Sequence, residues 1–546
     1  MEAGAALVEA LVDAGVDTAF TVPGESFLPV VEALRHQRNR IRLVSVRHEA
    51  GGAFAAHGYG VLTGRPAAVF VSRGPGATNA SIGLHAAQQD SVPLVLFIGQ
   101  IRSYARGREA FQEIDATAAF GSMTKAVLEP SSPADLPALA RRAVEIAVEG
   151  RPGPVVVTMP RDFGDGEVPV PAELGPVVRP AVVADAASLD ALVAALGEAK
   201  RPVIVAGELA RRPEAREPLA AFAAALGAPV LAAYRCQDVI DNELPAYAGH
   251  LEINPVPYQA EAVAASDLLV VLGSRLDGIT SREEAMVKGK RLAHVHPDAV
   301  VLARFGAAVP VQADVAPTLE AITARLPAAP ADRLAWRDGL HAHYLAFSTP
   351  GNVNIHGEMD LSKIAAAIRE TLPDDAVLVT DGGSFARWFH RYLRFTRPQT
   401  QGGSPSGAMG CGVPGAIGAA LATNDGRPVV AFVGDGGFMM NGQELSTAVR
   451  EGVPIKVVLC DNEVHGSILK GQLDRYGDES SFATRMGSPD FELIARGYGA
   501  AAWTVRSMDE WRPAFAAALA HEGPALIRLM FDARDIAPYG NEKDAV

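Results

Sequence analysis

The residues with the clearest chemical meaning form a Gly-Asp-Gly run at positions 434–436, between an apolar stretch and a helix-like one. The segment that this run opens closes on Asn462, directly after a second apolar stretch at 455–460. This order predicts a strand, a crossover and a second parallel strand, whose carboxyl ends open at one edge of a sheet. Asp435 and Asn462 would then reach the same ion. A hard cation prefers such oxygen ligands and leaves positions for phosphate oxygens, and glycines let the backbone approach them.

The pattern therefore predicts a site for a metal-bridged diphosphate. Taken alone, a Gly-Asp-Gly run also suits an ordinary turn after a strand. The spacing to Asn462 favours the binding site.

A second candidate for chemistry is Glu49, which opens a segment rich in Ala and Gly after the strand-like residues 41–45. A lone Glu at a helix start is more often a solvated charge that the helix dipole favours. The apolar residues that follow favour burial, which would keep a proton available on the carboxyl group. We therefore predict that Glu49 transfers a proton. His48 is predicted to be structural, because neighbouring helical residues point in different directions.

Together these motifs resemble the thiamine-diphosphate-dependent enzymes, and residues 3–125 are similar to the acetolactate synthases and their relatives. The resemblance rests on the Gly-Asp-Gly run with Asn462 one crossover later, and on the Glu49 segment. Asp461 stands where that family usually has a first Asn. The further matching segments are 22–25, 72–79, 90–94, 110–113 and 406–410.

The resemblance implies a role for several residues. Asp435, Asn462 and the main-chain oxygen of Val464 would hold Mg²⁺. Glu49 would share a proton with N1′ of the aminopyrimidine and so favour the basic imino tautomer. The residues expected to bind thiamine diphosphate are Pro23, Gly24, Glu49, Gly407, Met409, Gly434, Asp435, Gly436, Gly437, Asn462, Val464, His465 and Gly466.

The loop at 406–410 resembles the family loop that bends the cofactor. Met409 would wedge between the two cofactor rings, while the Gly407 carbonyl accepts a hydrogen bond from the 4′-amino group. The bend brings the 4′-nitrogen to the thiazolium C2, which is a proximity effect. A Met that only fills a gap in the core is the alternative, and it does not explain the glycines around it.

The expected reaction begins with a 2-keto acid. By resemblance, Phe111 and Gln112 line the active site as catalytic residues, whereas the segment 275–280 lacks the arginine that follows the Asp pair in acetolactate synthases. That departure weakens the assignment of a second 2-keto acid as acceptor. It also makes FAD doubtful, since the central part has no glycine-rich nucleotide loop. The cations that would replace the arginine are Lys125, Arg73 and Arg387, of which Arg73, directly before Gly74, is the one most expected to point at the cofactor cleft.

The function predicted from the sequence is thus a Mg-dependent, acetolactate synthase-like carboligase or decarboxylase. The alternative is a thiamine-diphosphate-dependent decarboxylase or carbon–carbon lyase that acts on a larger 2-keto or acyl substrate. A dinucleotide-binding protein drawn from Gly74 and Gly76 is weak, because the third glycine is missing. A non-catalytic thiamine-binding or regulatory protein is a further alternative, and the complete set of Glu49, Met409, Asp435 and Asn462 argues against it.

Composition limits the partners. The chain has 546 residues, 49% of them hydrophobic, which suits about three domains with separate cores. A net charge of −14 argues against nucleic acid as a partner. No apolar run reaches the roughly 18 residues of a membrane span, and no leader is expected, so we expect a soluble, cytoplasmic protein. The three cysteines, Cys236, Cys411 and Cys460, are expected to be buried thiols.

Strand-like and helix-like runs alternate three times, which predicts an α/β fold of three successive doubly wound parallel-sheet domains. By resemblance these are a pyrimidine-binding domain at 1–165, a central domain at 182–330 and a diphosphate-binding domain at 356–535. Irregular linkers are expected at 162–180 and 326–359, and a polar tail or lid at 533–546. The resemblance also implies a homodimer or homotetramer in which each cofactor lies between the first domain of one subunit and the third domain of another.

Overall fold

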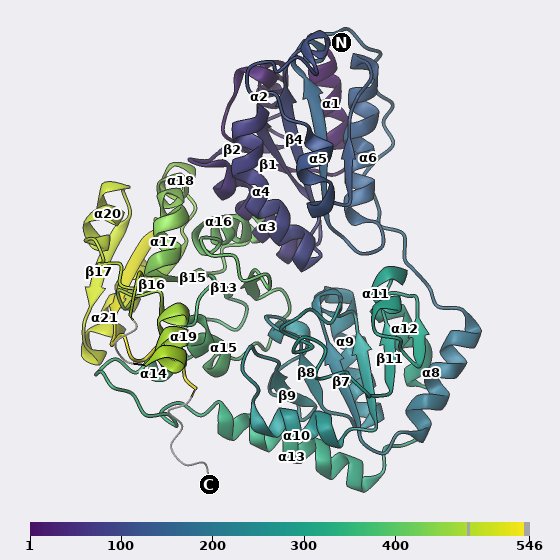
Figure 1. Cartoon of the computed structure of the whole chain (residues 1–546), viewed down its shortest axis with the longest axis vertical. Coiled ribbons are helices and arrows are strands. Elements are labelled where there is room, and N and C mark those ends of the chain that lie inside the picture. Colours follow the sequence, from purple (N-terminus) through teal and green to yellow (C-terminus); the bar gives the residue numbers. More distant parts are fainter. Residues whose placement is uncertain (478–480, 540–546) are drawn as a thin grey trace.

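The computed structural model describes residues 1–477 and 481–539. It contains three sheets of six strands, and every strand pair is parallel. Alternate residues of each strand enter different apolar clusters, so each sheet has a core on both faces. Figure 1 shows the three sheets as separate bodies that follow one another along the chain. The prediction of three successive doubly wound parallel sheets is confirmed.

The first sheet has the strand order β2-β1-β3-β4-β6-β5. Two of its strands, at residues 18–21 and 126–128, were not predicted from the sequence, because they are short and carry few large apolar residues. Its strands are β1 (Thr18–Thr21), β2 (Arg42–Ser45), β3 (Ala67–Ser72), β4 (Leu94–Gln100), β5 (Ala126–Leu128) and β6 (Pro154–Pro160), and its helices are α1 (Ala3–Asp13), α2 (Leu28–His36), α3 (Glu49–Thr63), α4 (Arg73–Asp90), α5 (Ala116–Phe120), α6 (Leu136–Val148) and α7 (Arg161–Gly164).

The second sheet has the order β12-β11-β10-β7-β8-β9. The expectation of an irregular stretch at 326–359 is wrong, because a 17-residue helix, α13, occupies half of it. Only Arg333, Leu340 and Tyr344 of that helix are buried, so its apolar stripe is too narrow to be recognised from sequence. The elements are β7 (Pro202–Ala206), β8 (Val230–Ala232), β9 (Tyr247–His250), β10 (Leu268–Leu272), β11 (Leu292–Val295), β12 (Val309–Val311), α8 (Ala186–Glu198), α9 (Pro213–Leu226), α10 (Pro257–Ala265), α11 (Ala299–Arg304), α12 (Val315–Thr323) and α13 (Ala331–Phe347).

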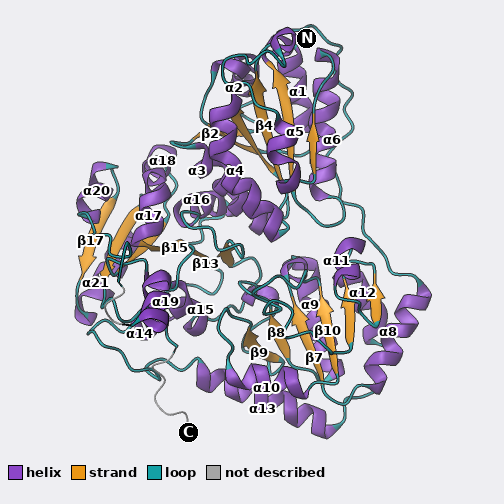
Figure 2. Ribbon diagram, in the orientation of Figure 1, coloured by secondary structure: helices purple, strands orange, loops and turns teal. Residues whose placement is uncertain are grey.

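The third sheet has the order β14-β13-β15-β16-β18-β17. Figure 2 shows its strands with helices beside them. The elements are β13 (Val377–Thr380), β14 (Gln401–Gly403), β15 (Val429–Gly434), β16 (Lys456–Asp461), β17 (Ala501–Val505), β18 (Ala525–Met530), α14 (Leu361–Thr371), α15 (Ala386–Tyr392), α16 (Gly412–Thr423), α17 (Asp435–Asn441), α18 (Leu445–Glu451), α19 (Gly466–Tyr476), α20 (Phe491–Gly497) and α21 (Met508–Ala520).

Helices α3 and α16 join the first and third domains through glycines. A Cβ placed at Gly418 would lie 1.8 Å from the carbonyl oxygen of Ala55, so no larger residue fits there. At the start of α3, Glu444 accepts hydrogen bonds from the backbone N–H groups of Arg47 and His48, each at 3.0 Å. The position of Glu49, the next residue, is therefore fixed against the third domain of its own chain.

The expectation of a polar tail, the first of the two alternatives for residues 533–546, is wrong for residues 533–539. Asp535 is 1% exposed and accepts hydrogen bonds from the backbone N–H and the ring of His356, and Ile536 is 7% exposed. The segment therefore packs into the third domain, and residues 540–546 lie outside the described residues. All three cysteines are buried and free, as expected. In the described part of the chain, no helix has the length and apolar character of a membrane span.

Candidate functional site

A cavity of about 300 Å³ opens at the carboxyl ends of the third sheet. Strands β15 and β16 are neighbours, and Gly434 lies opposite Cys460 in their register. Asp435 and Asn462, one and two residues further on, therefore both line the cavity. Of the residues predicted to bind the cofactor, those that line it are Gly407, Met409, Gly434, Asp435, Gly436, Gly437, Asn462, Val464, His465 and Gly466.

Asp435 has an unsatisfied charge. Its side chain is buried, and Oδ1 accepts a hydrogen bond from the N–H of Gly436 at 2.7 Å. Among the described residues nothing donates to Oδ2, which is fully buried. Burial, and after it the negative charge of Asp461, raises the pKa of Asp435 to about 7. A buried carboxylate in this state needs either a proton or a cation.

Asp461 has the opposite environment. Its Oδ2 accepts a hydrogen bond from Nε of Arg528 at 2.7 Å and lies 2.6 Å from Nη2 in the same ion pair, and Oδ1 accepts a hydrogen bond from Ser488 at 2.5 Å. The acid that replaces the family Asn therefore belongs to a buried ion pair with β18. Sequence analysis missed Arg528, although a single charge within the apolar strand 525–530 is a recognisable signal.

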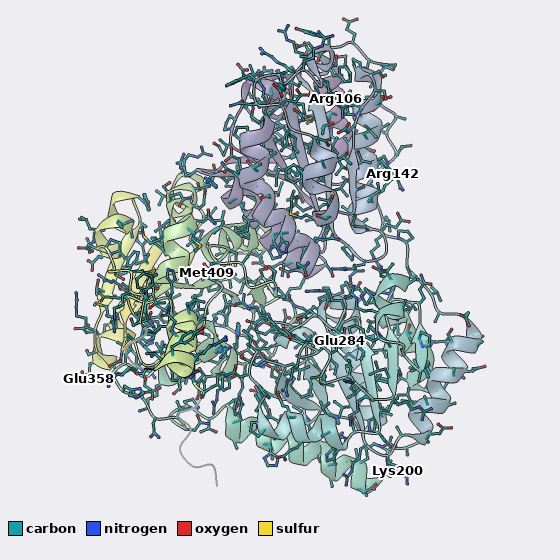
Figure 3. The ribbon with its side chains drawn as sticks, in the orientation of Figure 1. Arg106, Arg142, Lys200, Glu284, Glu358 and Met409 are labelled. Atoms are coloured by element: carbon teal, nitrogen blue, oxygen red, sulfur yellow. The ribbon has the colours of Figure 1, made fainter. Side chains whose placement is uncertain are left out.

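Glycines around Asp435 keep the backbone open to the cavity. A Cβ at Gly436 would lie 3.0 Å from Cε1 of His465 and 3.3 Å from Cε of Met409. A Cβ at Gly437 would lie 2.8 Å from Oδ2 of Asp381. The first of these contacts lies among the cavity-lining side chains, so a side chain at Gly436 would crowd the space beside Met409. The side-chain oxygens of Asp435 and Asn462 suit Mg²⁺, and the backbone of the glycines, which carries no side chains, suits a diphosphate. Figure 3 shows the position of Met409 in the third domain.

Glu49 belongs to a second cluster, at the carboxyl edge of the first sheet. It is the first residue of α3 and is half-buried, and Oε2 accepts a hydrogen bond from Nδ2 of Asn79 at 2.9 Å. A Cβ at Gly76 would lie 3.2 Å from Oε1, so this glycine leaves room for the carboxylate. His48 caps the helix, because its Nδ1 accepts from the N–H of Ala50 at 3.2 Å. The prediction that His48 is structural agrees with this bond.

The remaining predicted residues lie in loops at the same edge of the first sheet as Glu49. Pro23 and Gly24 follow β1, and the carbonyl of Gln112 accepts from the N–H of Gly74 at the start of α4. Phe111 is 75% exposed, which is unusual for so large an apolar side chain. None of these residues, nor Glu49, lines the cavity at Asp435. Within one chain the two halves of the predicted site are therefore apart.

Three family models match the chain in sequence. They are the N-terminal TPP binding domain of thiamine pyrophosphate enzymes at residues 1–119, their central domain at 189–322 and their C-terminal TPP binding domain at 381–529. The acetolactate synthase large subunit of Parasynechococcus marenigrum (strain WH8102) is 32% identical, covering 96% of this chain and 86% of its own. The acetolactate synthase isozyme 2 large subunit of Escherichia coli (strain K12) is 30% identical, and the match covers 96% of this chain and 95% of that one.

The chain belongs to the acetolactate synthase-like family of thiamine-diphosphate-dependent enzymes. Its fold matches that of a thiamine diphosphate-dependent 4-hydroxybenzoylformate decarboxylase from Rhodococcus jostii RHA1, with a TM-score of 0.84 over 97% of this chain and 99% of that one. At 24% identity this likeness shows the fold. The prediction that the chain is an enzyme of this family is confirmed.

The central domain of this thiamine-diphosphate-dependent enzyme also lines the cavity, and of that domain only the segment 275–280 was singled out from the sequence. Tyr234, Arg235, Ile253 and Ile279 face it together with third-domain residues. Arg235 is buried and donates to the carbonyls of Ser404 and Asp381 at 2.9 and 2.8 Å, which ties the two domains together at the cavity. Contacts between distant segments of this kind leave no periodic pattern in the sequence. The further lining residues that were not predicted are Gly382, Gly383, Ser384, Phe385, Cys460, Ser467, Ile468 and Ile536.

The three cations proposed to face an acceptor lie in different places. Lys125 precedes β5, at the opposite edge of the first sheet, where Nζ donates to the carbonyls of Ile146 and Glu149. Burial lowers the pKa of Lys125 to about 8. Its selection as a substrate-facing cation is therefore wrong.

Arg73 donates from Nη2 to Glu25 at 2.6 Å, so its charge is already paired. Arg387 lines the cavity at Asp435. Of the three candidates it alone is both in the cavity and free of a hydrogen-bonded carboxylate among the described residues.

Proposed function

We propose that this enzyme is a Mg²⁺-dependent carboligase that removes CO₂ from a 2-keto acid and joins the remaining acyl group to a second carbonyl compound. The observation that supports this most is the unsatisfied carboxylate of Asp435, which faces a cavity together with Asn462 and Met409. Relatives named as acetolactate synthases point to the same reaction class.

Mg²⁺ would be held by Asp435, Asn462 and the main-chain oxygen of Val464. These are hard oxygen donors at one edge of the sheet, and they match the preference of this ion. The backbone at Gly436 and Gly437 is bare and would lie against the diphosphate. Thiamine diphosphate supplies an electron sink for the bond electrons that remain when CO₂ leaves.

The aminopyrimidine of a cofactor bound at Asp435 of one subunit would share a proton with Glu49 of a second subunit. The Glu49 carboxylate lies outside the cavity of its own chain, and the exposed Phe111 projects from the same cluster. On the other side, Met439 and Met440 of α17 are 59% and 48% exposed beside the Asp435 cavity. Exposed apolar side chains next to both half-sites are expected where two subunits meet. We infer a homodimer, or a tetramer of two such dimers, with each active site between subunits.

In this arrangement Phe111 and Gln112 of one subunit would cover the cavity of the other. Gln112 has a positive φ of 65°, a strained conformation that a residue outside glycine rarely adopts. Such strain occurs often at functional loops. Pro23 and Gly24 would contact the pyrimidine from the same side.

A decarboxylase or carbon–carbon lyase is the second candidate. Ile279 lies where the cavity meets the central domain, in the segment that lacks the family arginine. An apolar side chain there favours a larger, less charged substrate over a small anionic acceptor. FAD is not part of either proposal.

The test is to incubate the protein with Mg²⁺, thiamine diphosphate and a panel of 2-keto acids, and to follow CO₂ and the organic products together. Carboligation predicts CO₂ with a coupled hydroxyketone or hydroxyketo acid. Aldehyde alone would favour the decarboxylase. Absence of CO₂ across the panel would contradict the proposal.

A further inference from the structure

Arg387 of α15 is a guanidinium group that its surroundings leave incompletely paired. It lines the cavity at Asp435, and its side chain is only 12% exposed. In the described ranges its closest carboxylate oxygen is Oε2 of Glu252, at 3.9 Å from Nε, which is beyond hydrogen-bond distance. Its other close contact is the ring of Tyr539, 5.6 Å away. Among the described residues no group forms a hydrogen bond with this guanidinium, so its N–H donors are available to a ligand in the cavity.

Buried side chains hold Glu252 in place behind Arg387. Glu252 is 1% exposed, and Oε1 receives a hydrogen bond from Nε2 of His250 at 2.7 Å. His390 lies on the third-domain side, with Nδ1 3.9 Å from the same oxygen and Nε2 3.1 Å from Oγ1 of Thr380. The carboxylate is therefore held by a hydrogen bond from His250, which ends β9, while His390 of α15 lies near it on the third-domain side.

The same cluster has the composition of a metal site, because ligand atoms of His250, Glu252 and His390 lie within 4.8 Å of one another. Its charge argues against a divalent ion. Burial, and after it the positive charges of Arg235, His250 and Arg387, lowers the pKa of His390 well below its ordinary value. The one carboxylate lies next to the guanidinium group of Arg387, so the cluster offers a divalent ion little net negative charge. The cluster instead positions Arg387 toward the cavity.

We propose that Arg387 determines specificity by binding a carboxylate that the substrate keeps through the reaction. This inference rests on the proposed function. A guanidinium group matches a carboxylate with two parallel hydrogen bonds, and the pairing is strong where water is excluded. The carboxylate that departs as neutral CO₂ is a poor partner, since a tight ion pair would stabilise the charge that must be given up. The retained carboxylate belongs either to the acceptor or to the far end of the donor.

Kinetics of Arg387→Met and Arg387→Lys test the assignment. In the Met variant the KM for the carboxylate-bearing substrate should rise about tenfold to a hundredfold, the size of a lost hydrogen bond to a charged group. The kcat should change little, as expected when ground-state binding is lost. Lys should restore part of the affinity. If the KM rises for the acceptor alone, the retained carboxylate belongs to the acceptor. If the KM rises only for donors with a terminal carboxylate, and not for their methyl esters, the retained carboxylate belongs to the donor.

Calorimetry keeps this result separate from the proposed function, because it needs no turnover. Succinate is titrated into protein loaded with Mg²⁺ and thiamine diphosphate, and its affinity should fall at least about tenfold in the Met variant. Equal affinity in both proteins, or no binding in either, contradicts the assignment. Loss of affinity for thiamine diphosphate itself would show that Arg387 binds the diphosphate instead. Zinc or another metal copurifying with the wild type but not with His250→Ala would show a metal site and also overturn it.

Discussion

Asp435 follows strand β15 and Asp461 ends the adjacent parallel strand β16, yet only the charge of Asp461 is neutralised by a guanidinium group. Arg528 donates a hydrogen bond to Asp461 and forms a buried ion pair with it, while Oδ2 of Asp435 is buried without a partner in the described part of the chain. The two carboxylates are close enough that the charge of Asp461 helps to raise the pKa of Asp435. One acid of the pair therefore stabilises the fold, and the other is left for a cation.

Replacement of Asp435 by Ala should abolish cofactor retention rather than only slow the reaction. Without the ion that we propose this carboxylate holds, the diphosphate charges would meet a sheet edge that still carries Asp461. Titration calorimetry with Mg²⁺ and thiamine diphosphate measures the effect. Unchanged affinity would contradict the assignment of Asp435 as a metal ligand.

Metal and cofactor binding should depend on pH through Asp435. Its folded-state pKa of about 7 lies above its ordinary value, so below pH 7 the cation must displace a proton. Affinity should weaken about tenfold for each pH unit below 7 and level off above it. Without ligands, the free energy of unfolding depends on pH in the opposite direction. The protonated acid stabilises the folded chain at low pH, and this contribution is lost as the pH rises from about 4 to about 7.

Asp435→Asn is the control for this pH dependence. The amide has no proton to lose, so the slope of the unfolding free energy between pH 4 and 7 should decrease in the variant without ligands. Denaturant unfolding at several pH values measures that slope. Identical slopes in the two proteins would mean that Asp435 does not titrate in this range.

Asp461→Asn should destabilise the fold by about 3–5 kcal/mol, because it leaves the Arg528 guanidinium buried with a weaker partner. The side chains of Asp461 and Arg528 are 0% and 10% exposed, which is the setting in which such a loss is large. The double variant Asp461→Asn, Arg528→Met should recover part of the loss. Chemical unfolding of all three variants gives the coupling free energy, and additive losses would show that the pair is not coupled.

Glu49→Gln should bind thiamine diphosphate normally but exchange the C2 proton of the cofactor roughly 10² to 10⁴ times more slowly, the usual size of general acid–base catalysis. An amide cannot share an acidic proton with N1′. Exchange is followed by NMR after an acid quench. Exchange at the wild-type rate would reduce Glu49 to a charge at a helix start.

The sequence predicted best what parallel topology dictates. Asp435 and Asn462 share a cavity because consecutive parallel strands leave their carboxyl ends at one edge. Arg387 was named as a candidate cation, but the nearest carboxylate, that of Glu252, lies in another domain, and no local pattern connects the two. Helix α13 was missed because most of its surface faces solvent. Local periodicity thus predicts elements, whereas contacts between domains require the packed structure.

The measurement that tests the shared active site most directly is complementation between Glu49→Gln and Asp435→Ala. Each variant alone has no complete site and should show little C2 exchange on added thiamine diphosphate with Mg²⁺. If the two chains are unfolded and refolded together, about half of the dimers should be mixed, and each mixed dimer has one intact site. Exchange should then recover to about a quarter of the wild-type rate per total protein by the same statistics. Recovery no greater than the sum of the separate variants would contradict a site built from Glu49 of one subunit and Asp435 of another.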